Sequence, residues 1–394
     1  MYSRSAAVST TSHSVNIYPA MNEKISAFLS ERIAANDFPS AVYLVAEKGE
    51  IFYHDALGNA VVEPERIPAK LDTIYDVASL TKVLVTALLA TQLVEYGDLS
   101  LDTPISAIVP QFDTAEKSGT TIFQLATHTS GFRDWIPLYL KSTNLLHITE
   151  RIAEEPLVKR RGESVLYSDL NFITLANVLE AITEHRLDTA YTDIVDELEL
   201  RRTDFTPITN RPIPWDTHDI AASEYGNEYE RGTCIEKFPE LGIPESALRS
   251  HLIWGEVHDG NAYFMGGVAG HAGLFSTAEE VFKIALQFLP EYTQLLQPET
   301  CELFRTNFTK GMKEDRSFAF QLASTEGSTA GTWMSPESFG HNGFTGTSLW
   351  IDPVKERIFV LLTNRTHNHP LPFVNINSVR RRFHDLAIEE LDRR

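Results

Sequence analysis

The position of the strand-like segments most constrains the fold, because they lie near both ends of the chain and not in its middle. Five segments are rich in β-branched and aromatic residues and predict strands: 41–46, 51–54, 318–322, 347–351 and 357–363. Turn residues separate two pairs of them, Lys48-Gly49 in the first and Asp352-Pro353 in the second. This layout suggests that strands from the two chain ends pair in one sheet.

Helical patterns complete this arrangement. Apolar residues recur at helical spacing in 22–36, 79–96, 121–126, 171–185 and 374–391. We therefore expect an α+β protein with one antiparallel sheet built from both chain ends, flanked by the terminal helices, and with a mostly helical lobe inserted. The sheet lobe would take about 16–75 and 300–394, the helical lobe about 76–299, and both would form a single domain of residues 16–394. The Ser/Thr-rich residues 1–15 are expected to form a flexible arm.

Two further segments have weaker patterns. Residues 205–262 are polar and rich in turn residues, so we expect irregular structure that could shape the mouth of a pocket. Residues 266–273 form a glycine-dense turn. Thr277 and Glu280 then predict a capping box for a helix that runs to Ala285.

Composition excludes several classes of protein. The formal charge of −20 argues against nucleic acid and anionic membranes as partners. The N-terminus lacks the apolar core of a signal peptide and we predict no transmembrane helix, so the expected location is cytoplasmic. Cys234 and Cys301 form neither a disulfide framework nor a metal-binding pattern, and we expect buried thiols and no metal or organic cofactor.

The strongest chemical motif is Ser79-Leu80-Thr81-Lys82, at the start of an apolar helix. Residues i and i+3 share a helix face, so the Lys82 ammonium can lie beside the Ser79 hydroxyl. A serine becomes a good nucleophile when a neighbouring base takes its proton. The alternative is structural, with Ser79 as an N-cap and Lys82 as a solvated residue of the first turn.

A tyrosine near a cation can also act as a base. Tyr167-Ser168-Asp169 lies just before the helix at 171–185, which would hold it on a rigid turn. Tyr191-Thr192-Asp193 and Tyr225-Gly226-Asn227 have similar patterns, and an ordinary packed aromatic residue remains the alternative for each. We prefer Tyr167 because it opens a helix in the helical part of the chain.

A third element, His341-Asn342-Gly343, lies in a glycine-rich segment that leads into a strand. Glycine lets a substrate approach the backbone, and an N–H there could pair with that of Ser79 to hold an oxyanion. His341 could donate a hydrogen bond or carry a positive charge part of the time. The rival is His271-Ala272-Gly273, which we expect to precede a helix cap, and either histidine could be an ordinary core residue.

In this order, Ser79-x-x-Lys82, Tyr167-Ser168-Asp169 and His341-Asn342-Gly343 resemble the three elements of the penicillin-binding, serine β-lactamase-like hydrolases. The similarity spans about residues 20–390. It is greatest to the class C-like branch, which includes β-lactamases, D-amino peptidases, D,D-carboxypeptidases and family VIII-type carboxylesterases.

The resemblance implies a role for each site residue. Ser79 would be acylated, while Lys82 and Tyr167 would share the proton transfers. The backbone N–H groups of Ser79 and Phe344 would form the oxyanion hole. Four residues would bind the substrate: Asp169, His341, Asn342 and Gly343.

Two departures from the family pattern bear on the substrate. Asp169 replaces an asparagine, and His341 replaces a lysine that would hold a substrate carboxylate. We therefore expect a carboxylesterase or small-amide hydrolase whose partner is a small ester or amide, with no nucleic acid or membrane bound and the oligomeric state open. The alternatives are a peptidase for D-amino acids or muropeptides, a weak β-lactamase, and a non-catalytic, penicillin-binding sensor.

Overall fold

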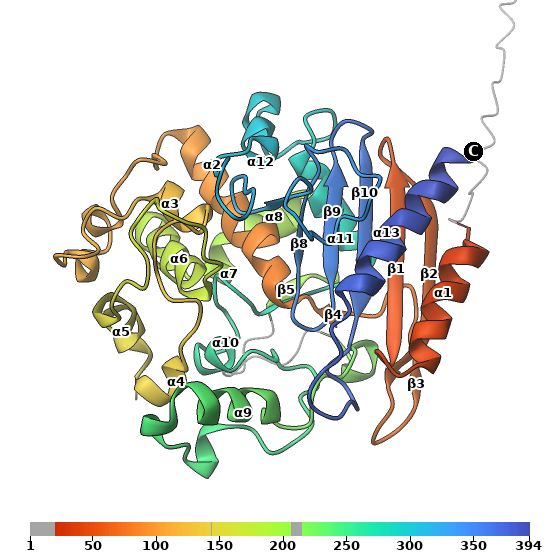
Figure 1. Cartoon of the computed structure of the whole chain (residues 1–394), viewed down its shortest axis with the longest axis horizontal. Coiled ribbons are helices and arrows are strands. Elements are labelled where there is room, and N and C mark those ends of the chain that lie inside the picture. Colours follow the sequence, from red (N-terminus) through yellow and green to blue (C-terminus); the bar gives the residue numbers. More distant parts are fainter. Residues whose placement is uncertain (1–19, 143, 206–214) are drawn as a thin grey trace, which may run out of the picture.

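The computed structural model describes residues 20–142, 144–205 and 215–394, so the predicted arm at 1–15 lies outside the described residues. Its main feature is a seven-stranded sheet in the order β3-β2-β1-β10-β9-β8-β7, with every neighbouring pair antiparallel. β1 (Ser40–Glu47) pairs with β10 (Arg357–Thr363) along its whole length. Figure 1 shows the strands of the two chain ends side by side. The predicted α+β fold with a sheet built from both ends is confirmed.

The first hairpin follows the predicted turn. Lys48 and Gly49 both have positive φ, at 51° and 75°, which matches the twist of a two-residue hairpin turn. The remaining strands of this sheet are β2 (Glu50–Val61), β3 (Ile67–Pro68), β7 (Gln321–Leu322), β8 (Phe339–Asn342) and β9 (Ser348–Asp352).

The prediction of a strand at 318–322 is largely wrong, and β8 was missed. Ala319 has a φ of 70°, which interrupts an extended backbone and leaves only Gln321–Leu322 as a strand. β8 is short and contains a glycine and two polar residues, so it carries no alternating apolar pattern.

The terminal helices cover one face of the sheet, as predicted. α1 (Glu23–Ala34) and α13 (Asn377–Asp392) pack together on it, while α11 (Ala278–Ala285) packs against β1 and β10 as part of the larger core. In β1, Tyr43 and Val45 belong to the core under α1 and α13, whereas Val42 and Leu44 belong to the larger core. This alternation is the period of two expected of a strand, and burial on both faces explains why the interior of β1, residues 41–46, is apolar.

Helices dominate the central part of the chain. They are α2 (Leu88–Tyr96), α3 (Ile122–Ala126), α4 (Leu138–Lys141), α5 (Ile148–Glu154), α6 (Asp169–Thr183), α7 (Leu187–Ala190), α8 (Thr192–Glu197), α9 (Glu228–Lys237), α10 (Gly260–Phe264) and α12 (Glu302–Arg305). A small sheet in the order β4-β6-β5 joins Tyr75–Asp76, Leu274–Ser276 and Asp204–Phe205. The division into two lobes stays a prediction.

Two local predictions need correction. The described part of 205–262 is not wholly irregular, because it contains α9 and α10; α9 is polar and buries only Glu230 and Cys234, so it has no apolar stripe. The capping box is half formed. Thr277 accepts a hydrogen bond from the Glu280 N–H, but the Glu280 carboxylate accepts from the backbone of Arg201 and Arg202 instead.

The segment after Ser79 is the centre of the larger core. It begins as a 3₁₀ turn (Ala78–Leu80), continues as a π-helix (Lys82–Ala87) and ends as α2, where Gly97 adopts a φ of 82° as the predicted stop. The prediction of one regular helix from Ser79 is therefore wrong at its start. By length and composition Ala78–Tyr96 could span a membrane, but 72% of its most apolar window is buried in this protein.

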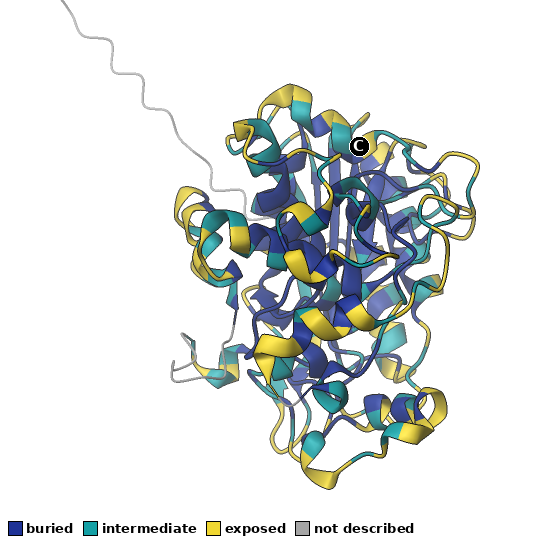
Figure 2. Cartoon of the chain, turned by 90° about the vertical axis from the view of Figure 1, so that its left-hand side faces the viewer, coloured by how far each residue is buried: buried dark blue, intermediate teal, exposed yellow. Residues whose placement is uncertain are grey.

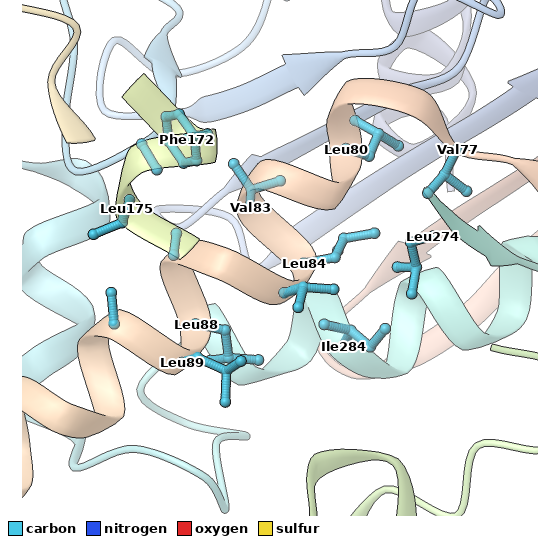
Figure 3. Close-up of a cluster of buried hydrophobic side chains, with 14 of the residues drawn as sticks. Val77, Leu80, Val83, Leu84, Leu88, Leu89, Phe172, Leu175, Leu274 and Ile284 are labelled. Carbon is cyan, nitrogen blue, oxygen red and sulfur yellow. The ribbon is translucent and has the colours of Figure 1, made fainter. Parts of the chain in front are cut away.

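Leucine side chains of this segment pack against α6, α11 and β6. Figure 3 shows Leu84 and Leu88 of the segment in one cluster with Phe172, Leu274 and Ile284. Each fully buried leucine contributes about 2 kcal/mol. Figure 2 shows this buried interior beneath exposed outer helices and loops. A rigid core thus fixes the backbone from which Ser79 projects.

Candidate active site

Ser79 lies on a tightly held turn that directly follows β4. Ala78 has a φ of 50°, an unfavourable conformation for a residue with a side chain. The Asp76 carboxylate stabilises it by accepting a hydrogen bond from the Ala78 N–H at 2.8 Å, and its other oxygen accepts one from the His258 N–H at 2.7 Å. The sequence therefore positions Ser79 through a strained residue that a buried acid restrains.

Lys82 is completely buried beside Ser79. Its Nζ donates to Ser79 Oγ at 3.0 Å and to the His271 carbonyl at 3.0 Å, and lies 2.7 Å from Asp169 Oδ1. Burial lowers the pKa of Lys82, but Asp169 and Tyr167 together raise it above its usual value. The alternative of a solvated Lys82 is wrong. The alternative of an N-cap is also wrong, because Ser79 lies inside the 3₁₀ turn and caps nothing.

Tyr167 reaches the same point from the loop before α6. Lys82 Nζ lies 5.1 Å from the Tyr167 ring centroid, and the Tyr167 hydroxyl is close enough to Lys82 and Ser79 for both to influence its pKa. Burial raises the pKa of Tyr167 and Lys82 lowers it, with a net rise, so the phenol is protonated at neutral pH. Of the rival tyrosines, Tyr191 is buried with an unpartnered hydroxyl and Tyr225 is 69% exposed.

A cavity of about 500 Å³ opens at this point. Its lining includes all the residues predicted for the site except Lys82, which lies beneath Ser79: Ser79, Tyr167, Asp169, His341, Asn342, Gly343 and Phe344. Three segments that are distant in sequence therefore converge on one cavity.

The turn after β8 lies against the nucleophile turn. Thr345 and Thr347 donate side-chain hydrogen bonds to the carbonyls of Asp76 and Val77, at 2.8 and 3.0 Å. The Gly343 N–H donates to the Thr347 carbonyl. Within the described chain, the Phe344 N–H has no backbone partner, which leaves it available for the predicted oxyanion hole.

The predicted part-time charge on His341 is wrong. His341 is 4% exposed, and burial followed by repulsion from Lys82 lowers its pKa well below the usual value, so the ring is neutral. Its Nδ1 lies 3.0 Å from the Asn342 carbonyl, so Nδ1 carries the proton and donates it there. Arg316, which pairs with Glu314 at 2.8 Å, places a permanent positive charge in the cavity lining.

The rival His271 also belongs to the site, although its side chain does not face Ser79. It precedes the strand β6 (Leu274–Ser276), not a helix cap as expected. Its carbonyl accepts from Lys82, and its Nε2 lies 2.9 Å from Asp259 Oδ1. Burial raises the pKa of Asp259, but His271, the Ala262 N–H and Lys82 together lower it below the usual value; burial and Asp259 raise the pKa of Glu230 to about 7.

Sequence reasoning missed Asp76, Glu230, His258, Asp259 and Arg316, all of which line the cavity. Two signals lay near them: the Ser79 motif, which begins three residues after Asp76, and the turn-rich segment 205–262, which contains Glu230, His258 and Asp259.

Donor atoms of Asp169, Asp259 and His271 lie within 4.8 Å of one another, a spacing that could suit a metal ion. However, Asp169 is paired with the Lys82 ammonium, and Asp259 is hydrogen-bonded to His271. A cation already lies among these atoms and would repel a divalent ion. The arrangement therefore favours an ion pair over a metal site.

Comparison with known proteins identifies the family. The sequence model of the family described as Beta-lactamase matches residues 25–380, which is most of the chain. The chain belongs to the beta-lactamase family. Among its relatives in this family, an Escherichia coli K12 protein provisionally named D-alanyl-D-alanine carboxypeptidase is 31% identical over 360 residues. The match covers 84% of this chain and 79% of the relative.

Solved structures confirm the beta-lactamase fold. EstCE1, described as a hydrolase with promiscuous acyltransferase activity, has a TM-score of 0.69 and 21% identity, and the match covers 92% of this chain and 97% of EstCE1. A penicillin-binding protein homologue from Caulobacter crescentus has a TM-score of 0.69 and 17% identity, and the match covers 94% of this chain and 99% of the homologue. At these identities the likeness shows the fold alone, and the substrate has to be argued from the cavity.

Proposed function

We propose that this protein is a serine hydrolase that forms an acyl-enzyme on Ser79 and acts on small esters or amides. The observation that carries the proposal is the buried contact of 3.0 Å between Lys82 Nζ and Ser79 Oγ, with the Tyr167 ring centroid 5.1 Å from Lys82 Nζ. A nucleophile, a cation and a phenol held together in a cavity wall have the geometry of covalent acyl transfer.

The reaction would proceed in two stages. Ser79 Oγ bonds to the substrate carbonyl carbon as its proton passes into the cluster of Lys82, Tyr167 and the Asp169 carboxylate, and the backbone N–H groups of Ser79 and Phe344 stabilise the oxyanion. The proton then moves to the leaving oxygen or nitrogen as its bond to carbon breaks. A water molecule then attacks the carbonyl carbon of the acyl-enzyme with the same proton transfers, and the bond to Ser79 Oγ breaks to release the acid.

The cavity lining favours an ester or small amide without a carboxylate beside the reacting bond. The neutral His341 supplies no ionic clamp where the family pattern has a lysine. Beyond it, Phe344 lies 4.8 Å from Tyr229 and 6.0 Å from Phe373, measured between ring centroids, so an apolar acyl or leaving group would find an aromatic wall.

A second candidate is a peptidase for D-amino-acid substrates. It is supported by the name of the Escherichia coli relative and by Arg316 in the cavity lining, which could attract a substrate carboxylate. Because Glu314 neutralises Arg316, we rank this candidate below the esterase.

The test is a panel of p-nitrophenyl acetate and butyrate, D-alaninamide and nitrocefin, assayed with the wild type, Ser79→Ala and the exposed control Ser30→Ala on α1. We expect ester turnover that Ser79→Ala abolishes and Ser30→Ala preserves, with unchanged thermal melting in both variants. Turnover that survives in Ser79→Ala would refute the assignment.

A fluorescent phosphonate and a fluorescent penicillin separate the remaining alternatives. An enzyme should be labelled by the phosphonate at Ser79 and should release a substrate acyl group quickly. A stable penicillin adduct without ester turnover would indicate a non-catalytic sensor, and faster hydrolysis of nitrocefin than of the esters would indicate a β-lactamase.

A further inference from the structure

The contacts of Lys82 in the resting protein are those of an ammonium ion, which has no lone pair to accept a proton. Nζ donates hydrogen bonds to Ser79 Oγ and to the His271 carbonyl, and it forms an ion pair with Asp169 Oδ1. The shortest contact, at 2.7 Å, is to Asp169, whereas an unprotonated amine would offer Ser79 a lone pair. The acid of this ion pair occupies the position where the family pattern has an asparagine.

We propose that Asp169 is a catalytic residue that takes the proton of Lys82, so that Ser79, Lys82 and Asp169 form a proton relay. This inference rests on the proposed function. As Ser79 Oγ bonds to the carbonyl carbon, its proton passes to Lys82 Nζ while a proton of Lys82 passes to Asp169 Oδ1. The carbonyl becomes an oxyanion, Asp169 becomes a neutral carboxylic acid and Lys82 remains an ammonium.

The same protons return when the tetrahedral intermediate collapses. The bond from carbon to the leaving group breaks, Lys82 gives a proton to the leaving oxygen or nitrogen, and Asp169 returns its proton to Lys82. Charge and atoms balance without any other reactant. Tyr167, a protonated phenol that lines the cavity with Ser79, does not need to ionise.

Burial makes this transfer accessible. Lys82 is fully buried, and the Asp169 side chain is 18% exposed at the cavity, where a bound substrate would cover it. A bound substrate would therefore separate the pair from water while the proton moves between the two groups. An asparagine at this position could hold the ammonium but could not take its proton.

The other charged groups around the pair have different partners. Asp259, the other acid in this cluster, is held by His271 Nε2 and by the Ala262 N–H, so among the described residues only Asp169 forms an ion pair with Lys82. The remaining titratable groups near the pair are Tyr167, the neutral rings of His128 and His341, and Arg316, which lies 5.5 Å from the Tyr167 ring centroid.

Asp169→Asn tests the relay because it keeps the shape of the side chain and removes its ability to accept a proton. With p-nitrophenyl butyrate we expect kcat to fall about 100-fold, the size of a general acid–base contribution, with KM changed less than about threefold.

The matched control is Asp134→Asn. The Asp134 side chain is half-exposed and pairs only distantly with Lys237, at 3.6 Å, so kcat should be unchanged. An Asp169→Asn variant that retains wild-type kcat, or is faster at neutral pH because Lys82 becomes a free amine, would overturn the relay.

A measurement on the wild type keeps the proposal testable if Asp169→Asn fails to fold. The relay moves two protons during acylation, so the acylation rate should vary non-linearly with the fraction of D₂O, and a linear dependence would overturn it. The assay also separates the two proposals. Wild-type turnover that does not depend on Ser79 would overturn both, whereas Ser79-dependent turnover with wild-type kcat in Asp169→Asn would overturn the relay alone.

Discussion

Gly343→Ala probes the contact between the two turns that form the centre of the site. An added Cβ at Gly343 would lie 2.6 Å from the Val77 carbonyl oxygen and still closer to the Thr347 hydroxyl. Real Cβ atoms essentially never approach another heavy atom within 3.0 Å, so the turn must move by about 0.4 Å or more. Gly343 does not have a positive φ, so the effect would come from this collision and not from backbone strain.

The expected loss follows from two local terms. Overpacking of a tight contact costs about 1–3 kcal/mol, and weakening the Thr347–Val77 hydrogen bond costs about 1 kcal/mol more. Because the same shift moves the Phe344 N–H relative to Ser79, activity should suffer too. A misplacement of about 1 Å can cost about 100-fold, so we expect kcat/KM to fall by about 10- to 100-fold.

The assay combines urea unfolding with ester hydrolysis, and Gly232→Ala is the matched control. Gly232 is exposed on α9, and no atom lies within 4 Å of its added Cβ, so this change should be neutral or should stabilise by about 0.5–1 kcal/mol. Wild-type kcat/KM in Gly343→Ala would show that the two turns are not in the contact described here.

Three further predictions follow from buried polar groups. Asp76→Ala leaves two backbone N–H groups, including that of Ala78, without a partner. It should therefore lower the free energy of unfolding by about 2 kcal/mol or more and should also lower kcat. Equal kcat in Asp76→Ala and the wild type would contradict this. Burial lowers the pKa of His54 to about 4 and of His384 to about 3. In the unfolded chain the pKa of each ring is near 6.5, so the two neutral rings contribute their whole stabilisation above that pH, and this stabilisation is lost as the pH falls below it. Each should reduce the free energy of unfolding by about 1.4 kcal/mol between pH 6 and 5, measured by urea unfolding, and a flat profile would reject the burial of both rings. Burial raises the pKa of the Cys301 thiol to about 12, so iodoacetamide at pH 8 should label it only in urea, and rapid labelling of the native protein would contradict its position.

The sequence by itself determined the elements whose causes are local. Turn residues with alternating apolar residues specified the first hairpin, and helical periodicity specified α1, α6 and α13. The order of the Ser79, Tyr167 and His341 elements also placed these residues correctly on one cavity. Residue type and spacing carry this information because turn geometry, side-chain period and functional-group chemistry are properties of short segments.

The tertiary structure alone decided the charge states and the supporting residues. No local pattern shows that Lys82 is fully buried, that His341 is neutral, or that the His271 carbonyl and Asp169 lie at the same ammonium. Protonation depends on desolvation and on charges brought near through space, and these are set only when distant segments pack. For the same reason the proposed role of Asp169 depends on Lys82, which lies 87 positions earlier in the chain and 2.7 Å away in the folded protein.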